Sequence, residues 1–451
     1  MTPDENRIFY RRMFELALPI GLQHLMLASV AAADAMMLGR VAQAEMTAVS
    51  MATQIQFIQN VFLYAVTTAG AILGAQYYGK GDSETLRDLF HLMLRYGGLV
   101  SIIFFISCEF FPGILMHFFT SDPELVRIGI DYLRIAGWSY LMTGISQCYL
   151  MIMKVTDYVK ECAAISSGAV LLNIIFNAFL IFGLLGLPAM GARGAALATT
   201  LARMLELLVC LVIFTGKNYI RPVWTRIFSG SRALTMDFAR QALPLLGGNL
   251  MWGVGLTSYT AIIGHVGSDA AAANAVSSVV RDLVCCGCNG IGTAAGIMVG
   301  NELGAGKLDL GKRYGIKLRN VGWIIGLGST ALVLAVTPFV VRFVILTDEA
   351  RACLTGMMVI MAVYMIGRSV NTVTINGVLD GGGDTIFDMY SLAVSMWCIA
   401  IPLAFVGAFF FKWPVLFVYA CTCLDEVGKI PWVMRRFNKF YWVQDLTRER
   451  E

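Results

Sequence analysis

Twelve long apolar stretches, separated by short polar segments, restrict the possible folds of this sequence more than any other feature. Each stretch is long enough for a helix to cross a hydrocarbon core of about 30 Å. None of them alternates like a barrel strand, and helices and closed barrels are the only structures that span a membrane. The sequence therefore predicts an all-α membrane protein with twelve transmembrane helices, at about 14–38, 47–76, 89–118, 126–153, 160–185, 193–216, 236–264, 271–300, 314–345, 350–379, 387–411 and 414–434.

The composition agrees with a chain that is embedded in a membrane. Of its 451 residues, 57% are hydrophobic and 14% are charged, whereas soluble domains contain about 25% charged residues. We therefore expect the lipid bilayer to be a partner of the protein, and we expect no nucleic acid. The polar N-terminal segment is not followed by a clear cleavage site, which predicts an uncleaved first helix.

Several functional classes lack their usual signatures in this sequence. The eleven cysteines lie mostly within apolar stretches and do not have the paired spacing of a zinc site, so we expect small core residues and neither a metal nor a cofactor. The apolar stretches contain no HExxH, GxSxG or acid–histidine cluster, which argues against an enzyme. The Gly-rich segment 377–385 lacks the lysine of a phosphate-binding loop, so ATP is not the expected energy source.

Lysine and arginine are distributed unevenly between the two sides of the predicted membrane region. With the N-terminus placed inside, 24 of the 34 basic residues fall in inner segments and seven in outer segments. Such a bias is the positive-inside signal. We therefore predict a multi-pass protein of the cell membrane with both termini in the cytoplasm.

An internal repeat divides the predicted helices into two halves. Pro19 in "ELALPI" matches Pro244 in "RQALPL", and Gly81 in "GAQYYGKGD" matches Gly306 in "VGNELGAGKLD", each at a shift of 225 residues. Six spans separate equivalent points, so the halves have the same topology. The sequence predicts two pseudo-symmetric six-helix lobes, with an N-lobe at 1–216, a cytoplasmic linker at 217–235, a C-lobe at 236–436 and a cytoplasmic tail at 437–451.

The sequence resembles the MATE (multidrug and toxic compound extrusion) transporters over almost its whole length. The resemblance rests on the two proline-containing helix starts, the paired glycine loops, and the segments "ADAMMLGR", "NIIFNAFLIFG", "GARGAALATTLAR" and "DGGGDT". It implies a monomeric secondary antiporter that exports organic, cationic or amphipathic, compounds in exchange for H⁺ or Na⁺ by alternating access. The alternative is a flippase-like exporter of a lipid-linked or anionic substrate, which would need arginines in its cavity.

Asp34 is the one acidic residue in the apolar segment 18–40. A carboxylate costs at least about 2.5 kcal/mol at the centre of a membrane helix, so such residues are functional candidates. Its position is similar to that of the acidic residue that the MATE family uses in its N-lobe, which implies a site for H⁺ or Na⁺. The alternative is an aspartate at a hydrated helix end. The equivalent position in the second half is Tyr259, which predicts a single, asymmetric site.

Further ligands for this cation site are expected on the fifth and sixth spans. Asn173 and Asn177 are four residues apart, so they share one helix face. Thr199 and Thr200 both offer hydroxyls, and we expect Thr200 to be the ligand. Family members often have an acid at the second asparagine position, and an amide cannot carry the proton, so more of the coupling is left to Asp34. The alternative for these polar residues is a structural role in hydrogen bonds between helices.

The C-lobe departs from the family pattern. Some members carry a glutamate in span seven, where this sequence has Asn249 and Trp252 and no acid between Pro244 and Gly264. A glutamate-based C-lobe mechanism therefore does not transfer to this chain. We expect Asn249, Trp252 and Tyr259 to line the substrate cavity.

The remaining charges inside the spans predict ion pairs. Arg203 and Glu206 are three residues apart, as are Glu426 and Lys429, so each pair is expected to neutralise itself. Adjacent residues on a helix point in different directions, so we expect the neighbours Arg281 and Asp282 to diverge and to join Arg368 in a network. These charges are candidates for the substrate cavity, with a purely structural role as the alternative.

Overall fold

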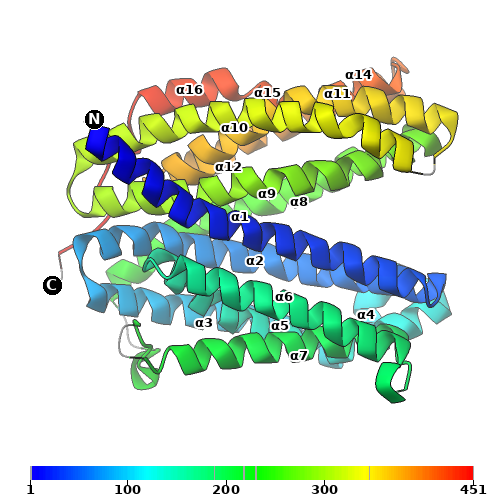
Figure 1. The fold of residues 1–451 in the computed structure, drawn as a ribbon, viewed down its shortest axis with the longest axis horizontal. Helices are drawn as coiled ribbons and strands as arrows, with labels where there is room; N and C mark the ends of the chain where they lie inside the picture. The colour runs from blue at the N-terminus through cyan, green and yellow to red at the C-terminus, as the bar shows by residue number, and fades with distance from the viewer. Residues whose placement is uncertain (1–2, 187, 217–218, 229–230, 345, 450–451) are drawn as a thin grey trace. The chain divides into compact units, whose positions relative to one another are not determined.

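The computed structural model describes residues 3–186, 188–216, 219–228, 231–344 and 346–449, without the side chains of residues 31, 32, 34, 35, 185 and 224. Within these ranges all regular secondary structure is helical, and there is no strand (Figure 1). The longer helices are α1 (Pro3–Gly39), α2 (Gln43–Lys80), α3 (Ser83–Phe110), α5 (Pro123–Val155), α6 (Val159–Phe182), α7 (Gly191–Ile213), α8 (Arg232–Val266), α9 (Ser268–Gly304), α10 (Leu308–Phe343) and α11 (Asp348–Asn371). The shorter elements are α4 (Pro112–His117), η1 (Leu184–Gly186), η2 (Trp224–Arg226), the π-helices η3 (Thr372–Leu379) and η4 (Ala393–Ala400), and α12 (Thr385–Leu392), α13 (Ile401–Phe409), α14 (Val415–Thr422), α15 (Leu424–Val427) and α16 (Ile430–Asn438).

The chain forms two compact units. Unit 1 contains residues 1–24, 75–81 and 243–451, and unit 2 contains residues 25–74 and 82–242. Helices α1, α2 and α8 therefore each contribute to both units. The prolines Pro19 and Pro244 lie inside α1 and α8, close to the points where these helices change unit. A proline in a helix interior removes a backbone hydrogen bond and favours a bend. The predicted lobe boundaries stay a prediction.

Each unit has its own apolar core. In unit 2, α5 packs against α3 and α7, and α6 packs against α7. In unit 1, α9, α10 and α11 pack against one another, and η3 packs against α9. The core of unit 1 is rich in methionine, with Met357, Met358, Met361 and Met365 fully buried on α11. These flexible side chains fill irregular space between helices.

The paired glycine loops of the repeat fold in the same way. Gly81 follows α2 with φ +81°, and Gly306 follows α9 with φ +74°. A left-handed backbone of this kind favours glycine because side chains with a Cβ adopt it only at a cost. Asp82 then caps α3, because its Oδ1 accepts a hydrogen bond from the Thr85 backbone N–H at 2.9 Å. The helix ends are thus encoded locally.

The end of α2 and the end of α9 approach each other closely in unit 1. A Cβ on Gly79 would lie 1.9 Å from the Asn301 carbonyl oxygen, and a Cβ on Gly304 would lie 1.9 Å from the Gln76 carbonyl oxygen. These two contacts exchange under the 225-residue shift, so they are related by the internal repeat. Small residues permit such close backbone contact between membrane helices.

The last predicted span is not one continuous helix. The segment 414–434 is divided among α14, α15 and the start of α16, and the prediction of a single helix was wrong. Pro431 stands in the first turn of α16, where its missing N–H is tolerated, so a new helix begins there. In the described part of the chain, nine helices are long and apolar enough to cross a membrane, and the other three predicted spans correspond to α5, α8 and α14–α16.

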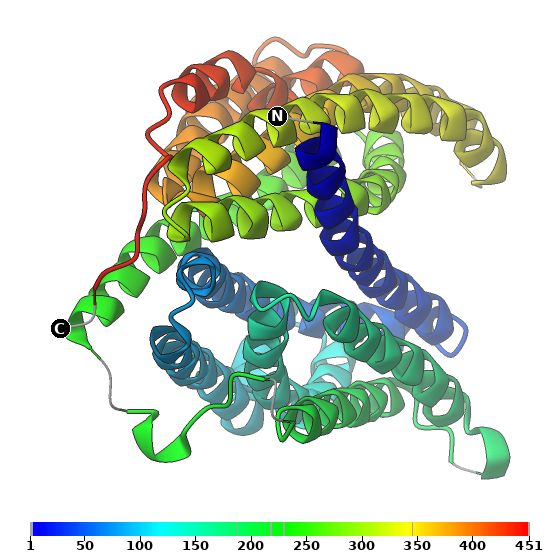
Figure 2. The same ribbon diagram turned by 60° about the vertical axis from the view of Figure 1, so that its left-hand side comes forward.

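An extended segment after α16 docks on unit 1 and is visible in red in Figure 2. Trp442 is fully buried, and its ring stacks on Phe437. The Gln444 side chain donates a hydrogen bond to the Gly382 carbonyl at 3.0 Å, and the Leu446 backbone N–H donates to Gln76 Oε1 at 2.6 Å. The segment therefore joins the turn before α12 to the end of α2.

Candidate substrate cavity and charge network

A cavity of about 810 Å³ lies in unit 2, between α1, α2, α5, α6 and α7. This volume is within the usual range of about 300–1,000 Å³ for small-molecule sites. About half of the lining residues are aliphatic or methionine, and the others carry hydroxyl, amide or guanidinium groups. The lining residues are Leu27, Val30, Leu38, Met46, Thr47, Val49, Ser50, Met51, Thr53, Gln56, Asn60, Tyr132, Ala169, Val170, Asn173, Ala195, Thr199, Ala202 and Arg203.

Three of the residues expected near the cation site meet in a hydrogen-bonded chain at this cavity. Asn177 Nδ2 donates to Asn173 Oδ1 at 3.2 Å, and Asn173 Nδ2 donates to Thr199 Oγ1 at 3.1 Å. Thr200 faces elsewhere, because its hydroxyl donates to the backbone carbonyl of Ile135 at 3.0 Å. Thr199 is therefore the threonine beside the asparagines. Asn173 and Thr199 line the cavity, and their amide and hydroxyl oxygens are suitable ligands for a hard cation such as Na⁺.

Asp34 lies in α1, but its side chain is outside the described part of the structure. Its role in the cation site stays a prediction.

Arg203 and Glu206 form the ion pair that their spacing predicts. Arg203 Nη1 donates to Glu206 Oε2 at 2.7 Å, and the Ser146 hydroxyl donates to Glu206 Oε1 at 2.7 Å. The Glu206 side chain is fully buried, and the Arg203 side chain is 19% exposed. Both carboxylate oxygens are therefore satisfied inside unit 2, while the guanidinium reaches the cavity wall. The predicted contact between these two residues is confirmed.

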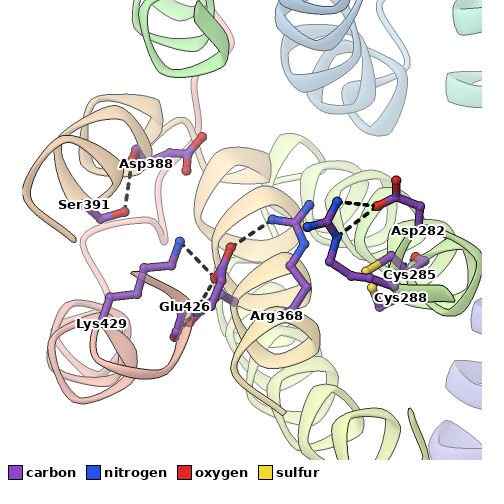
Figure 3. A network of polar contacts seen from close by, with 10 residues as sticks. Asp282, Cys285, Cys288, Arg368, Asp388, Ser391, Glu426 and Lys429 are labelled. Atoms are coloured by element: carbon purple, nitrogen blue, oxygen red, sulfur yellow. Dashed lines mark hydrogen bonds and ion pairs between the residues drawn. The ribbon is translucent and has the colours of Figure 1, made fainter. Parts of the chain in front are cut away.

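A second cluster of charges lies in unit 1, where Glu426 is at its centre (Figure 3). Glu426 Oε1 accepts from Arg368 Nη1 at 2.9 Å, and Oε2 lies 3.0 Å from Lys429 Nζ. Asn371 Nδ2 donates to Glu426 Oε2 and to the Glu426 backbone carbonyl, both at 2.7 Å. One buried carboxylate on α15 thus connects α11 to the start of α16. The predicted Glu426–Lys429 pair is confirmed.

Arg281 and Asp282 on α9 do not diverge, contrary to the expectation. Arg281 Nε donates to Asp282 Oδ1 at 3.0 Å. The arginine side chain is long enough to turn back across the angle between neighbouring positions on a helix. Asp282 is the exposed member of the pair, and Arg281 is mostly buried.

The other predicted cavity residues of unit 1 lie on α8 and are not among the described residues that line the unit 2 cavity. Tyr259 is buried in an apolar group that includes Met396, and Trp252 packs against the same group. Asn249 is half-buried. Asn249, Trp252 and Tyr259 lie along one stretch of α8. This stretch is joined to η4 by a hydrogen bond from Trp397 Nε1 to the Met251 carbonyl at 3.2 Å.

The contact between Asn371 and Glu426 could not be predicted from the sequence, because the two residues are far apart in the chain. Spacing predicted only the local pair of Glu426 with Lys429. The π-helix η3 begins at Thr372, directly after Asn371. Such wide turns re-aim side chains within a helix and occur frequently at functional sites. A polar residue at the start of a helix distortion is the signal that points to this position.

Asp380 lies just beyond η3, outside the long apolar helices, and is buried. Its Oδ1 has no hydrogen-bond partner among the described residues. Burial raises the pKa of Asp380 well above its ordinary value, and the neighbouring carboxylates of Asp388 and Asp384 raise it further. Asp384 is itself paired, because it accepts two hydrogen bonds from Arg436 at 2.7 and 2.8 Å.

These features define a class of protein, a helical membrane transporter built from an internal repeat with a solute-sized cavity in one unit. The MatE family model matches the chain twice, over residues 19–179 and 244–406, and the chain belongs to the MATE family of transporters. The two matches begin 225 residues apart, at Pro19 and Pro244, which confirms the repeat that the sequence predicts. The family consists of transporters and not of enzymes, as expected from the sequence.

Curated relatives match the chain over most of its length. It is 22% identical to an uncharacterized transporter, YisQ, of Bacillus subtilis over 435 residues, which covers 96% of this chain and 95% of YisQ. It is 26% identical to a probable multidrug resistance protein, NorM, of Bradyrhizobium diazoefficiens, with 87% of this chain and 85% of NorM covered. The chain is thus similar over most of its length to an uncharacterized transporter and to a probable multidrug resistance protein of bacteria.

Solved structures share the fold. An outward-facing multidrug resistance MATE transporter of the MOP superfamily superposes with a TM-score of 0.85 at 15% identity, covering 95% of this chain and 96% of the other. The Vibrio cholerae MATE transporter VcmN in its bent form gives a TM-score of 0.86 at 14% identity, covering 96% and 97%. The predicted fold class, an all-α membrane protein with twelve transmembrane helices, is confirmed.

Proposed function

We propose that this MATE transporter exports amphipathic organic compounds through the unit 2 cavity and exchanges them for H⁺ or Na⁺ by alternating access. The observation that carries this proposal is the cavity itself, because its volume and its mixed apolar and polar wall suit an amphipathic organic molecule of moderate size. Membership of a multidrug efflux family supports the same conclusion.

We place the coupling site at the same cavity. Asp34 is the proposed carrier of the proton or ligand of Na⁺, and the chain of Asn177, Asn173 and Thr199 supplies neighbouring oxygens. Loading a cation neutralises a carboxylate that is costly in an apolar helix. If the loaded and empty states of unit 2 differ in substrate affinity, cation binding and substrate binding are linked, as antiport requires.

The proposed setting is the cell membrane, with both termini in the cytoplasm and the single chain as the working unit. The excess of lysine and arginine in one set of connecting segments supports this orientation. Reporter fusions that are active on only one side of the membrane, placed at each end of the chain, would test it.

The experiment that tests the proposed function is export of a fluorescent amphipathic dye from vesicles that contain the purified protein. The H⁺ and Na⁺ gradients are dissipated separately. Export should stop when one of them is removed and continue when the other is removed. Export that persists without either gradient would contradict secondary transport.

One observation favours the second candidate, export of an anionic compound. Arg203, a cation, is the only charged residue among the described residues that line the cavity.

A further inference from the structure

The charge of the unit 2 cavity is asymmetric, although Arg203 and Glu206 neutralise each other as a pair. Glu206 is fully buried behind the wall and is absent from the lining, whereas Arg203 belongs to the lining. A ligand in the cavity therefore meets the positive end of the pair first. The other described polar lining groups are hydroxyls and amides, which carry no charge.

The guanidinium of Arg203 has hydrogen-bond donors to spare. An arginine side chain carries five N–H donors. Nη1 donates to Glu206, and the guanidinium makes no other hydrogen bond with the described residues. None of its nitrogens is among the buried groups without a partner, and Arg203 is partly exposed and belongs to the cavity lining, which is where we expect the uncommitted donors to be available.

Glu206 holds this arginine in place. Its second oxygen is fixed by the Ser146 hydroxyl on α5, so the carboxylate cannot turn toward the cavity without losing a buried hydrogen bond. The guanidinium is thereby oriented before any ligand arrives. Arginine binds planar oxyanions in a bidentate manner, and hydrogen bonds between charged groups are the strong ones.

We infer that the unit 2 cavity binds amphipathic compounds that carry an anionic group, with the carboxylate or other oxyanion on Arg203 and the apolar body against the aliphatic part of the wall. This inference rests on the proposed function and names the substrate class for the same cavity. Arg203 selects the charge of the substrate, and Glu206 is a positioning residue that acts through it.

Three probes with one ring system separate the alternatives: pyrenebutanoate, pyrenebutanol and pyrenebutylamine. They share the apolar body and differ in the charge of the end group. Their binding is measured by fluorescence with the full-length protein in nanodiscs, against empty nanodiscs for the lipid background. The wild type should bind the butanoate at least about tenfold more tightly than the alcohol. A hydrogen bond to a charged group contributes at least about 1.5 kcal/mol, which corresponds to about a tenfold difference in affinity.

Two variants should shift butanoate binding in opposite directions. Arg203→Gln should weaken it about tenfold or more and leave binding of the alcohol nearly unchanged. Glu206→Gln keeps an oxygen that can accept hydrogen bonds from Arg203 and Ser146, so the arginine stays in place. This variant should strengthen butanoate binding about threefold or more, because it removes a negative charge roughly 6 Å from the bound carboxylate, even at the dielectric constant of water. A purely structural ion pair would instead lose binding of all three probes in both variants.

The double variant Arg203→Gln with Glu206→Gln guards against misfolding, because it leaves no unpaired buried charge. It should lose butanoate binding as the single arginine variant does. Equal binding of the three probes to the wild type, or unchanged butanoate binding by the double variant, would overturn the anionic substrate class and leave the proposed function standing. If none of the probes binds, the proposed cavity and this inference both fall.

Discussion

The reciprocal glycine contacts between α2 and α9 give the sharpest prediction about stability. Gly79→Ala would place a Cβ 1.9 Å from the backbone oxygen of Asn301, and Gly304→Ala would do the same at Gln76. Carbon atoms of this kind essentially never approach within 3.0 Å, so the two helix ends must separate by about 1.1 Å. The obstruction is backbone, which cannot rotate away as a side chain can.

The expected cost follows from overpacking. Forcing extra atoms into a well-packed contact costs about 1–3 kcal/mol. Gly287→Ala, also on α9, is the matched control, because a Cβ there meets nothing within 4 Å. Without a clash, the change from glycine to alanine stabilises a helix by about 0.4–1 kcal/mol. The clashing and control variants should therefore differ by about 1.5–4 kcal/mol.

A thiol-reactive fluorogenic dye provides the assay. The eleven cysteines are free and most are buried, so the dye reports their exposure as the protein unfolds on heating. Gly79→Ala and Gly304→Ala should melt well below the wild type, by similar amounts, and Gly287→Ala at or above it. If Gly79→Ala melts with the control, the close approach of α2 and α9 is not as described.

Three further predictions concern unit 1. Glu426→Gln should cost about 3–5 kcal/mol, because it leaves Arg368 without its buried counter-charge; an unchanged melting temperature would contradict this. Leu446→Pro removes the N–H that donates to Gln76, so amide hydrogen exchange in residues 75–81 should accelerate, whereas Leu446→Ala should leave it unchanged; equal exchange in the two variants would refute the docking of the tail. The pKa of Asp380 is higher in the folded than in the unfolded state, so its contribution to stability is complete at acid pH and is lost as pH rises through the folded-state pKa. Asp380→Asn should therefore stabilise the protein at neutral pH and flatten the fall of melting temperature with rising pH; a steeper fall would contradict the assignment.

Features with a local cause could be predicted from sequence. The apolar stretches have the length that a bilayer requires, and the loops around Gly81 and Gly306 need a left-handed backbone at fixed positions. The residues of each pair, Arg203–Glu206 and Glu426–Lys429, are three positions apart in the chain. Their spacing alone therefore indicates that they are in contact.

Features that depend on packing between distant segments could not be predicted. Thr199 and Thr200 point about 100° apart around the axis of α7, because they are neighbours on a helix. Which of them faces the asparagines therefore depends on how α7 is rotated in the bundle. The joining of Asn371 to Glu426 depends on the π-helix after α11 and on the break before α16. Burial of Trp442 depends on where an extended segment runs.

We propose cation-driven export through the unit 2 cavity with Asp34 as the coupling residue, and transport by the Asp34→Asn variant tests this proposal. Asparagine resembles the protonated acid but cannot release a proton. In vesicles that carry the coupling gradient, the variant should not export the dye, although its affinity for the dye should stay within about tenfold, or roughly 1.4 kcal/mol, of the wild type. Export by Asp34→Asn at the wild-type rate would contradict the account and move the coupling site elsewhere.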